Sequence, residues 1–206
     1  MNNPILIIGH AALPENLCNA IIEMHEVAPF TELKSMNEEH GGHFAPLHEE
    51  DEDRVKFTNE QGRESYTILS SNPDFMQILE WVDEFVPWGD DFEMVSYMQI
   101  LKYPMESFCP FHKDDSDEGD TGTVIFNLNE DFTGGNLTVD GHKIIPFTGS
   151  MVAFNNSTER WHGVEPVLTG ERYVLSMWFA PHLEESMTEY DTLGDAPTHP
   201  KTQIKL

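Results

Sequence analysis

The chain has 206 residues, 39% hydrophobic and 11% aromatic, which suffices for one domain with a sizeable core. Its 37 acidic and 11 basic side chains give a formal net charge of -26, which repels phosphate backbones and excludes nucleic acid as an expected partner. No apolar run approaches the roughly 20 residues that span a bilayer, and the first three residues lack the basic segment of an export signal. Cys18 and Cys109 cannot build a disulfide framework, so we expect a soluble cytoplasmic protein with no membrane partner.

The first ninety residues are predicted to form two helices with supporting strands. A short strand is expected over 3–8, and apolar residues at helical spacing predict a helix over 14–26. Residues 36–64 are polar without a clear period, which favours a surface loop or hairpin that could act as a lid. A helix-start signal then opens a second amphipathic helix over 71–86.

From residue 92 onward, turn residues separate a series of short strand-like segments. These segments lie at 92–103, 121–128, 136–139, 143–147, 150–154, 161–167 and 172–179. Asp140-Gly141 between two of them is a strong hairpin turn signal. Helices followed by many short strands predict an α+β, mainly β fold, a jelly roll supported by N-terminal helices. We expect a single domain over 1–206, with supporting elements over 1–91, the core over 92–181 and a tail over 182–206.

A candidate metal site begins at His112 and Asp114. The two side chains stand two residues apart, so both emerge on one face of an extended segment. His162 lies downstream in the aromatic segment 161–167 and supplies a third ligand. Two imidazoles and one carboxylate, with open positions opposite, are typical of an Fe(II) site that accepts oxygen and a co-substrate.

Other patterns of ligand residues compete with this one. His48 with Glu50 and His182 with Glu184 have the same spacing, but neither pair has a second histidine in an obvious facing strand. A calcium loop that starts at Asp114 fails, because its twelfth position would be Ile125, which cannot chelate. Core or surface histidines remain the alternative for His112 and His162 considered by themselves.

Arg172, one of only four arginines, opens the most apolar predicted strand. Alternation places Arg172 and Ser176 on one face, where a guanidinium fork and a hydroxyl can bind one carboxylate. A turn at 168–170 can fold Arg172 back beside His162. An ion pair with one of the many acidic residues is the alternative.

Several ordered motifs together resemble the prolyl 4-hydroxylase-like group of 2-oxoglutarate and Fe(II)-dependent oxygenases. They are His112-Lys113-Asp114, Thr123 to Asn129, Gly134-Gly135-Asn136-Leu137, Pro146, Gly149, Phe154, His162 to Val167, Gly170, Arg172-Tyr173 and Trp178-Phe179, and the opening stretch from Ala12 to Ile22. The similarity covers most of residues 5–181. One departure is Asn127, since related hydroxylases often have a tyrosine just before the Leu-Asn pair.

The resemblance implies a double-stranded β-helix, a cupin-like jelly roll in which two sheets enclose the metal. It assigns Fe(II) to His112, Asp114 and His162, and the distal carboxylate of 2-oxoglutarate to Arg172, with Ser176 and Tyr103 as further contacts. It also implies dioxygen as a substrate, succinate and CO2 as co-products, and ascorbate as an accessory reductant.

The leading hypothesis is a prolyl hydroxylase-like enzyme that hydroxylates a C–H bond of a peptide or protein. The same site could instead hydroxylate a free amino acid or another small metabolite, because the metal centre does not choose the substrate. Two other hypotheses are a metal- or partner-binding module without turnover and a cupin-type dioxygenase that needs no keto acid.

Overall fold

The structure is a computed structural model. It describes residues 6–8, 11–35, 44–46, 53–85, 92–113, 122–155 and 160–181. The helices of these ranges are α1 (Glu15–Val27) and α2 (Pro73–Phe85). The strands are β1 (Leu6–Ile8), β2 (Leu33–Ser35), β3 (Phe44–Pro46), β4 (Arg54–Thr58), β5 (Glu64–Leu69), β6 (Phe92–Tyr103), β7 (Cys109–His112), β8 (Gly122–Asn127), β9 (Thr133–Gly134), β10 (Leu137–Val139), β11 (His142–Ile144), β12 (Met151–Asn155), β13 (His162–Val164), β14 (Val167–Thr169) and β15 (Arg172–Pro181).

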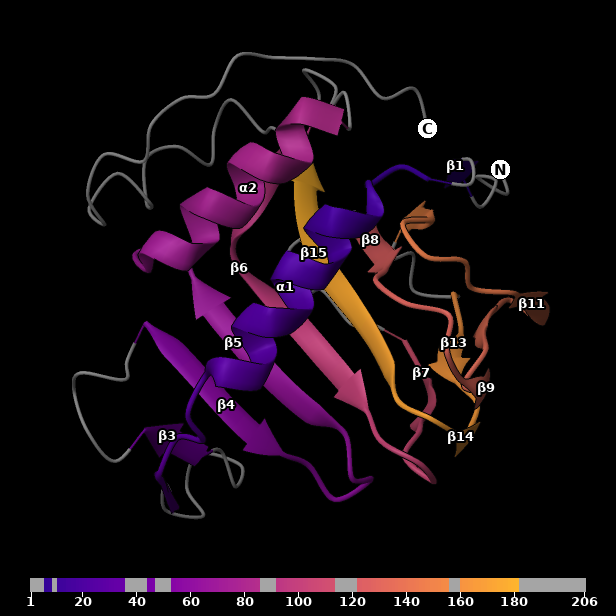
Figure 1. The fold of residues 1–206 in the computed structure, drawn as a ribbon, viewed down its shortest axis with the longest axis horizontal. Coiled ribbons are helices and arrows are strands. Elements are labelled where there is room, and N and C mark those ends of the chain that lie inside the picture. The colour runs from indigo at the N-terminus through magenta and orange to yellow at the C-terminus, as the bar shows by residue number, and fades with distance from the viewer. Residues whose placement is uncertain are drawn as a thin grey trace.

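The described elements form one large and one smaller antiparallel sheet. The large sheet has the strand order β1-β12-β8-β15-β6-β5-β4, and the smaller one has the order β11-β10-β13-β7. Two further strand pairs, β14-β9 and β2-β3, complete the described strands. Helices α1 and α2 lie together over one face of the large sheet, and the smaller sheet lies beyond it (Figure 1).

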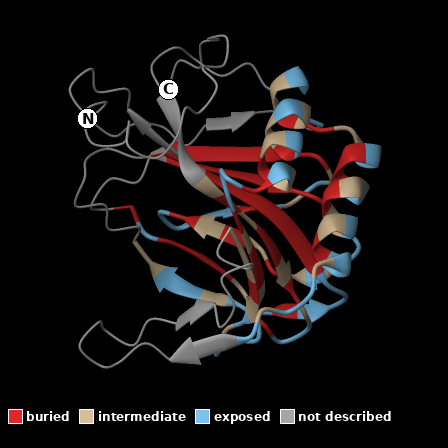
Figure 2. Ribbon diagram, turned by 90° about the vertical axis from the view of Figure 1, so that its left-hand side faces the viewer, coloured by how far each residue is buried: buried red, intermediate tan, exposed pale blue. Residues whose placement is uncertain are grey.

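The central strands β12, β8 and β15 of the large sheet are buried on both faces because their residues alternate between two apolar clusters. On β15, Tyr173, Leu175 and Met177 pack in the cluster that includes the helices, whereas Val174 packs in the cluster shared with the smaller sheet. Figure 2 shows these strands buried between the helices and the other strands. The predicted alternation of the strand over 172–179 is therefore confirmed, and Arg172 falls on the face of Val174, away from the helices.

Both helices present an apolar stripe to the large sheet. Leu17, Ile21 and His25 of α1 are buried at helical spacing. The N-terminus of α2 is capped by Asn72, whose Oδ1 accepts a hydrogen bond from the backbone N–H of Asp74 at 2.9 Å. The predicted helices over 14–26 and 71–86 are thus confirmed, although residue 86 lies outside the described ranges. No helix in the described part of the chain is long and apolar enough to cross a membrane.

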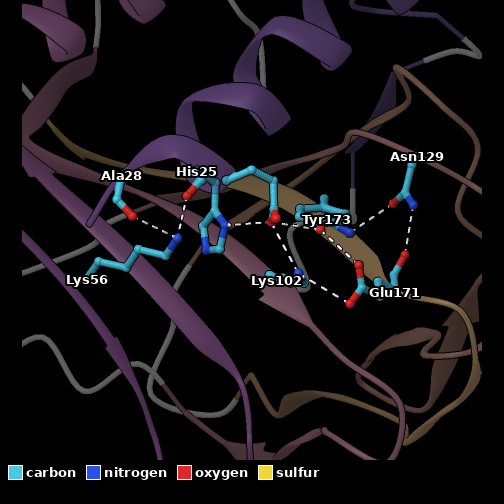
Figure 3. A network of polar contacts seen from close by, with 8 residues as sticks. His25, Ala28, Lys56, Lys102, Asn129, Glu171 and Tyr173 are labelled. Carbon is cyan, nitrogen blue, oxygen red and sulfur yellow. Dashed lines mark hydrogen bonds and ion pairs between the residues drawn. The ribbon is translucent and has the colours of Figure 1, made fainter. Parts of the chain in front are cut away.

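The C-terminus of α1 is held by a buried lysine from the large sheet. The Nζ of Lys56 donates to the carbonyl of His25 and, at 3.1 Å, to that of Ala28 (Figure 3). These donors satisfy carbonyls that the helix itself leaves unpaired, and the positive charge suits the negative end of the helix dipole. Beside them, the ring of the fully buried His25 contacts the carboxylate of Glu26 at 3.3 Å.

A chain of polar contacts links this helix end to β6 and β15. Glu26 accepts from the hydroxyl of Tyr173 at 2.9 Å and from Lys102 at 3.2 Å, and Lys102 also pairs with Glu171 at 3.2 Å. Asn129 closes the network, because it accepts from the backbone N–H of Tyr173 and donates to the carbonyl of Glu171 (Figure 3). The network therefore anchors α1 at the point where β15 begins with Arg172.

The structure refines two predictions. Residues 54–58 and 64–69 form the hairpin β4-β5, so this part of the polar segment 36–64 is a hairpin rather than a loop. Its polar pattern hid the strand because a lysine, Lys56, is the buried residue of β4. The predicted single strand over 161–167 is wrong, since β13 ends at Val164 and β14 begins at Val167. Asp140-Gly141 makes the predicted hairpin turn, with positive φ at both residues.

Burial of His25 predicts a pH dependence of the free energy of unfolding. Burial lowers the pKa of His25 to about 4, and the charge of Lys56 acts in the same direction. The carboxylate of Glu26 raises this pKa and so opposes the shift. Lys102 also lowers this pKa. The unfolded chain, with an ordinary histidine pKa of about 6.5, binds the proton more tightly. The contribution of His25 is therefore complete above about pH 6.5 and declines by roughly 3 kcal/mol as the pH falls to about 4.

Urea unfolding between pH 4 and 7 measures this effect when the protein is compared with His25→Phe. The phenylalanine variant is expected to lose less stability over this pH range, since its ring cannot take up a proton. Equal losses in the two proteins would contradict the assignment.

Candidate active site

Strands β7 and β13 of the smaller sheet bring two predicted metal ligands together. His112 and His162 are direct cross-strand partners, and their ring centroids are 4.3 Å apart. His162 is buried and also packs on the ring of Phe154, at a centroid distance of 5.0 Å. Cross-strand neighbours on one face are close enough to share a ligand. The two imidazoles therefore fit a common metal ion.

The backbone orients the ring of His112. Its Nδ1 lies 2.9 Å from the carbonyl oxygen of Pro110, which can only accept, so Nδ1 carries the hydrogen and donates. Nε2 is then the unprotonated nitrogen, the form of the ring that can bind a metal ion. A hydrogen bond of this kind fixes the tautomer and the ring direction of a metal-binding histidine.

The third predicted ligand, Asp114, lies outside the described residues. Within the described ranges no group of three or more metal-binding side chains occurs. The competing pairs, His48 with Glu50 and His182 with Glu184, also lie outside these ranges. The structure therefore brings together two of the three predicted ligands.

Arg172 is a buried cation without a counter-charge among the described residues. Its side chain is 1% exposed, and Nη2 donates to Oδ1 of Asn127 at 3.1 Å. Its guanidinium lies 5.2 Å from the ring centroid of Tyr103. In the described part of the chain, Nε and Nη1 have no hydrogen-bond partner. Burial lowers the pKa of Arg172, while Tyr103 and Cys109 act in the opposite direction. A guanidinium with two unused donors fits a carboxylate, which accepts two parallel hydrogen bonds.

Asn127 supports this guanidinium. Its Nδ2 donates to Oγ of Ser150 at 3.0 Å, so its Oδ1 faces Arg172 and accepts. Ser150 in turn donates to the carbonyl of Phe147 at 2.7 Å. The residue that departs from the tyrosine of related hydroxylases is therefore part of the arginine pocket. Sequence reasoning treated it only as a departure.

The backbone of Gly135 lies close to the side-chain stem of Arg172. Gly135 has a φ of +58, and a Cβ at this position would lie 2.9 Å from Val167 and 3.3 Å from Cδ of Arg172. Only glycine adopts this backbone conformation at little cost and leaves room for the arginine stem. This gives a physical reason for one glycine of the Gly134-Gly135 motif.

The other two predicted co-substrate contacts occupy different positions relative to Arg172. Tyr103 is the direct cross-strand partner of Arg172 on β6. Ser176 is buried on the same strand as Arg172, four residues farther along, and pairs with Gln99 and Ile125. Four residues of strand span about 13 Å, so contact of Ser176 with the same carboxylate stays a prediction.

Sequence reasoning missed one charged residue of this region. Arg63, in the polar segment, lies with Nη1 3.5 Å from the hydroxyl of Tyr103 and 3.5 Å from Sγ of Cys109. Nothing in its local sequence distinguishes it from a solvated arginine. Only the pairing of β5 with β6 brings it to Tyr103.

The part of the chain that contains this site is similar to known proteins. Residues 98–180 match the model of the 2OG-Fe(II) oxygenase superfamily. The match includes all six predicted site residues, which are Tyr103, His112, Asp114, His162, Arg172 and Ser176. The prolyl 3-hydroxylase 1 proteins of Homo sapiens and Rattus norvegicus are each 34% identical to this chain over 82 residues. The matched part covers 34% of this chain and 11% of each relative, so the chain spans a small part of their length.

Solved structures share the fold along most of the chain. A Pseudomonas putida prolyl-4-hydroxylase is 20% identical with a TM-score of 0.53, covering 88% of this chain and 95% of that one. A Trichoplax adhaerens prolyl hydroxylase, in complex with a hypoxia-inducible factor peptide fragment, is 15% identical with a TM-score of 0.59, covering 91% and 88%. A Burkholderia pseudomallei oxidoreductase of the 2OG-Fe(II) oxygenase family is 17% identical with a TM-score of 0.56, covering 86% and 85%. The resemblance predicted from the sequence motifs is confirmed.

The pairing of Asn127 with Arg172 yields a test of the pocket. Asn127→Asp places a carboxylate where the amide oxygen accepts from Arg172, so the guanidinium gains an internal counter-charge. We expect a more stable protein that binds 2-oxoglutarate at least about tenfold more weakly, because the internal carboxylate competes with that of the ligand. Thermal unfolding and titration calorimetry measure the two effects, with Asn19→Asp on the exposed face of α1 as the control. Unchanged affinity would argue against an anion pocket at Arg172.

Proposed function

We propose, from the premise that this chain is a prolyl hydroxylase-like member of the 2OG-Fe(II) oxygenases, that it hydroxylates a C–H bond of a peptide or protein. The observation that carries the proposal is the presence of two features among the described residues. Paired histidines lie on the smaller sheet, and a buried guanidinium with unused donors opens β15. The first feature suits a metal ion and the second suits a carboxylate.

In this proposal His112, Asp114 and His162 hold Fe(II). When bound together with 2-oxoglutarate and dioxygen, iron supplies the oxidation that converts C–H into C–OH and yields succinate and CO2. The chain contributes position. The bond from His112 to Pro110 presents Nε2 to the metal, and Phe154 buries one side of the ring of His162.

Arg172 orients the co-substrate. Its Nε and Nη1 would bind the distal carboxylate, with the hydroxyls of Tyr103 and Ser176 as further donors. Asn127 holds Nη2 and so leaves the other two donors for the ligand. The apolar cluster that includes Ile125 and Val174 surrounds this face and excludes water, which strengthens the electrostatic attraction. No side chain is required as a general acid or base.

A peptide or protein is the proposed substrate. The likeness to the Trichoplax adhaerens prolyl hydroxylase, which is in complex with a peptide fragment, supports this choice over a free amino acid. The superfamily match supports 2-oxoglutarate, Fe(II) and dioxygen as the reagents. Ascorbate as an accessory reductant rests on the resemblance alone.

We also propose a fold type, a cellular location and the absence of a nucleic-acid partner. We propose that the two sheets around the second apolar cluster form a double-stranded β-helix, which the contribution of both sheets to that cluster supports. The proposed cytoplasmic location rests on the sequence, whose two cysteines cannot build a disulfide framework. Absence of a nucleic-acid partner rests on the net charge of -26.

Replacement of the buried arginine tests the co-substrate role. Arg172→Met is expected to weaken 2-oxoglutarate binding by about 10- to 100-fold, because a charge-assisted hydrogen bond contributes roughly 1.5–3 kcal/mol. Thermal stability is expected to stay the same or rise, since an unpaired buried charge is removed. Succinate formation and gain of one oxygen on proline-rich peptides, measured by mass spectrometry, should both decline. Arg54→Met is the control. Full turnover in the Arg172 variant would favour a dioxygenase that needs no keto acid.

Removal of the imidazoles tests the metal role. His112→Ala and His162→Ala are each expected to lower Fe(II) or Mn(II) affinity by more than tenfold, because each removes one of three ligands. The exposed His142 on β11 provides the matched control His142→Ala. Metal content after dialysis, measured by mass spectrometry, separates the variants. Equal metal content in all three would refute the assignment, and absence of succinate in the intact protein would favour a binding module.

A further inference from the structure

A second guanidinium, that of Arg63, reaches the same tyrosine as Arg172. Arg63 Cζ lies 5.8 Å from the ring centroid of Tyr103, and Arg172 Cζ lies 5.2 Å from it. The chain has only four arginines, and two of them meet at this buried ring. Among the described residues neither forms an ion pair with an aspartate or glutamate.

The β4-β5 turn holds Arg63 in place. Oδ1 of Asn59 accepts from the backbone N–H of Gln61 and of Arg63, each at 3.0 Å, and the backbone N–H of Asn59 donates to the carbonyl of Arg63 at 2.9 Å. Gly62 has a φ of +74, which suits glycine. An asparagine that bonds its own turn in this way gives the loop a defined shape. The side chain of Arg63 therefore starts from an ordered backbone.

The hydrogen-bond chemistry of the phenol follows from its neighbours. A guanidinium carries only donors, so Nη1 of Arg63, 3.5 Å away, requires the oxygen of Tyr103 to accept. The guanidinium of Arg172, whose Cζ lies 5.2 Å from the ring centroid of Tyr103, is a second donor-only group beside this phenol. The hydroxyl hydrogen of Tyr103 must then point away from both cations. No acceptor for it occurs among the described residues.

The buried region around Tyr103 therefore contains more hydrogen-bond donors than acceptors. Nε of Arg63 and both Nε and Nη1 of Arg172 are buried without a partner among the residues that the structure describes, and the hydroxyl of Tyr103 has a hydrogen to donate. Buried donors without acceptors are costly, and a ligand rich in acceptor oxygens removes that cost. A dicarboxylate meets this requirement.

We propose that Arg63 is a positioning residue for the co-substrate, acting through Tyr103. It occupies the phenol oxygen as a donor, directs the hydroxyl hydrogen toward a carboxylate oxygen of 2-oxoglutarate, and adds a second positive charge near that ligand. This inference rests on the proposed function. It deepens the proposal, because it assigns the β4-β5 hairpin a role in binding the co-substrate.

A double-mutant cycle on binding, without turnover, tests the proposal. Titration calorimetry measures the affinity of the Mn(II)-loaded protein for 2-oxoglutarate in the wild type, Arg63→Gln, Tyr103→Phe and the double variant. We expect Arg63→Gln to weaken binding about tenfold when Tyr103 is present, and no more than about twofold when phenylalanine replaces it. Arg54→Gln removes an arginine from the same hairpin outside the pocket and is expected to bind like the wild type.

A conservative variant keeps the test usable if Arg63→Gln does not fold. Arg63→Lys retains the charge and one donor, so it is expected to lose less affinity than the glutamine variant, and again only in the presence of Tyr103. Equal losses in the tyrosine and phenylalanine backgrounds, or no loss in either, would overturn the role of Arg63. A loss of binding confined to Arg172→Met would leave the proposed function intact. If the wild type does not bind 2-oxoglutarate, the proposed function itself fails.

Discussion

The burial of Arg172 without a carboxylate partner is the constraint on which the site depends. A guanidinium that is 1% exposed loses most of its hydration, and its described contacts are an amide oxygen and a phenol. Such an arrangement costs folding free energy unless a ligand supplies negative charge. The buried guanidinium lies at the start of β15. There the backbone of Gly135 lies close to the stem of Arg172, and Asn127 accepts a hydrogen bond from Nη2 of Arg172.

The large sheet supports this pocket because it separates two environments. Its helix-covered face is an apolar core that α1 and α2 seal, and its other face carries Arg172, Ser176 and Tyr103 toward the smaller sheet. Successive residues of β15 point to opposite faces of the sheet, so they contribute alternately to the helix-covered core and to the face that carries the site. The network from Lys56 to Glu171 anchors α1 next to the first residue of that strand and thereby ties the helix layer to the pocket (Figure 3).

The chain has the motif order of the 2OG-Fe(II) oxygenases that it resembles but differs beside Arg172. Asn127 stands where related hydroxylases often have a tyrosine, and its short amide reaches both Ser150 and Arg172. A tyrosine donates and accepts through one hydroxyl oxygen, whereas an asparagine accepts through Oδ1 and donates through Nδ2. Here Oδ1 of Asn127 accepts its hydrogen bond from Arg172. Arg63, which enters from the β4-β5 hairpin, adds a second cation to this region.

The sequence alone determined the features that depend on local periodicity. It predicted both helices, the turn at Asp140-Gly141 and the faces of β15, because side-chain direction in a helix or strand follows from position along the chain. The tertiary structure decided which distant residues meet. Strand pairing placed His112 against His162 and carried Arg63 to Tyr103, and the bond to Ser150 turned the amide of Asn127 toward Arg172. These contacts depend on long-range register and side-chain rotation, which no local pattern encodes.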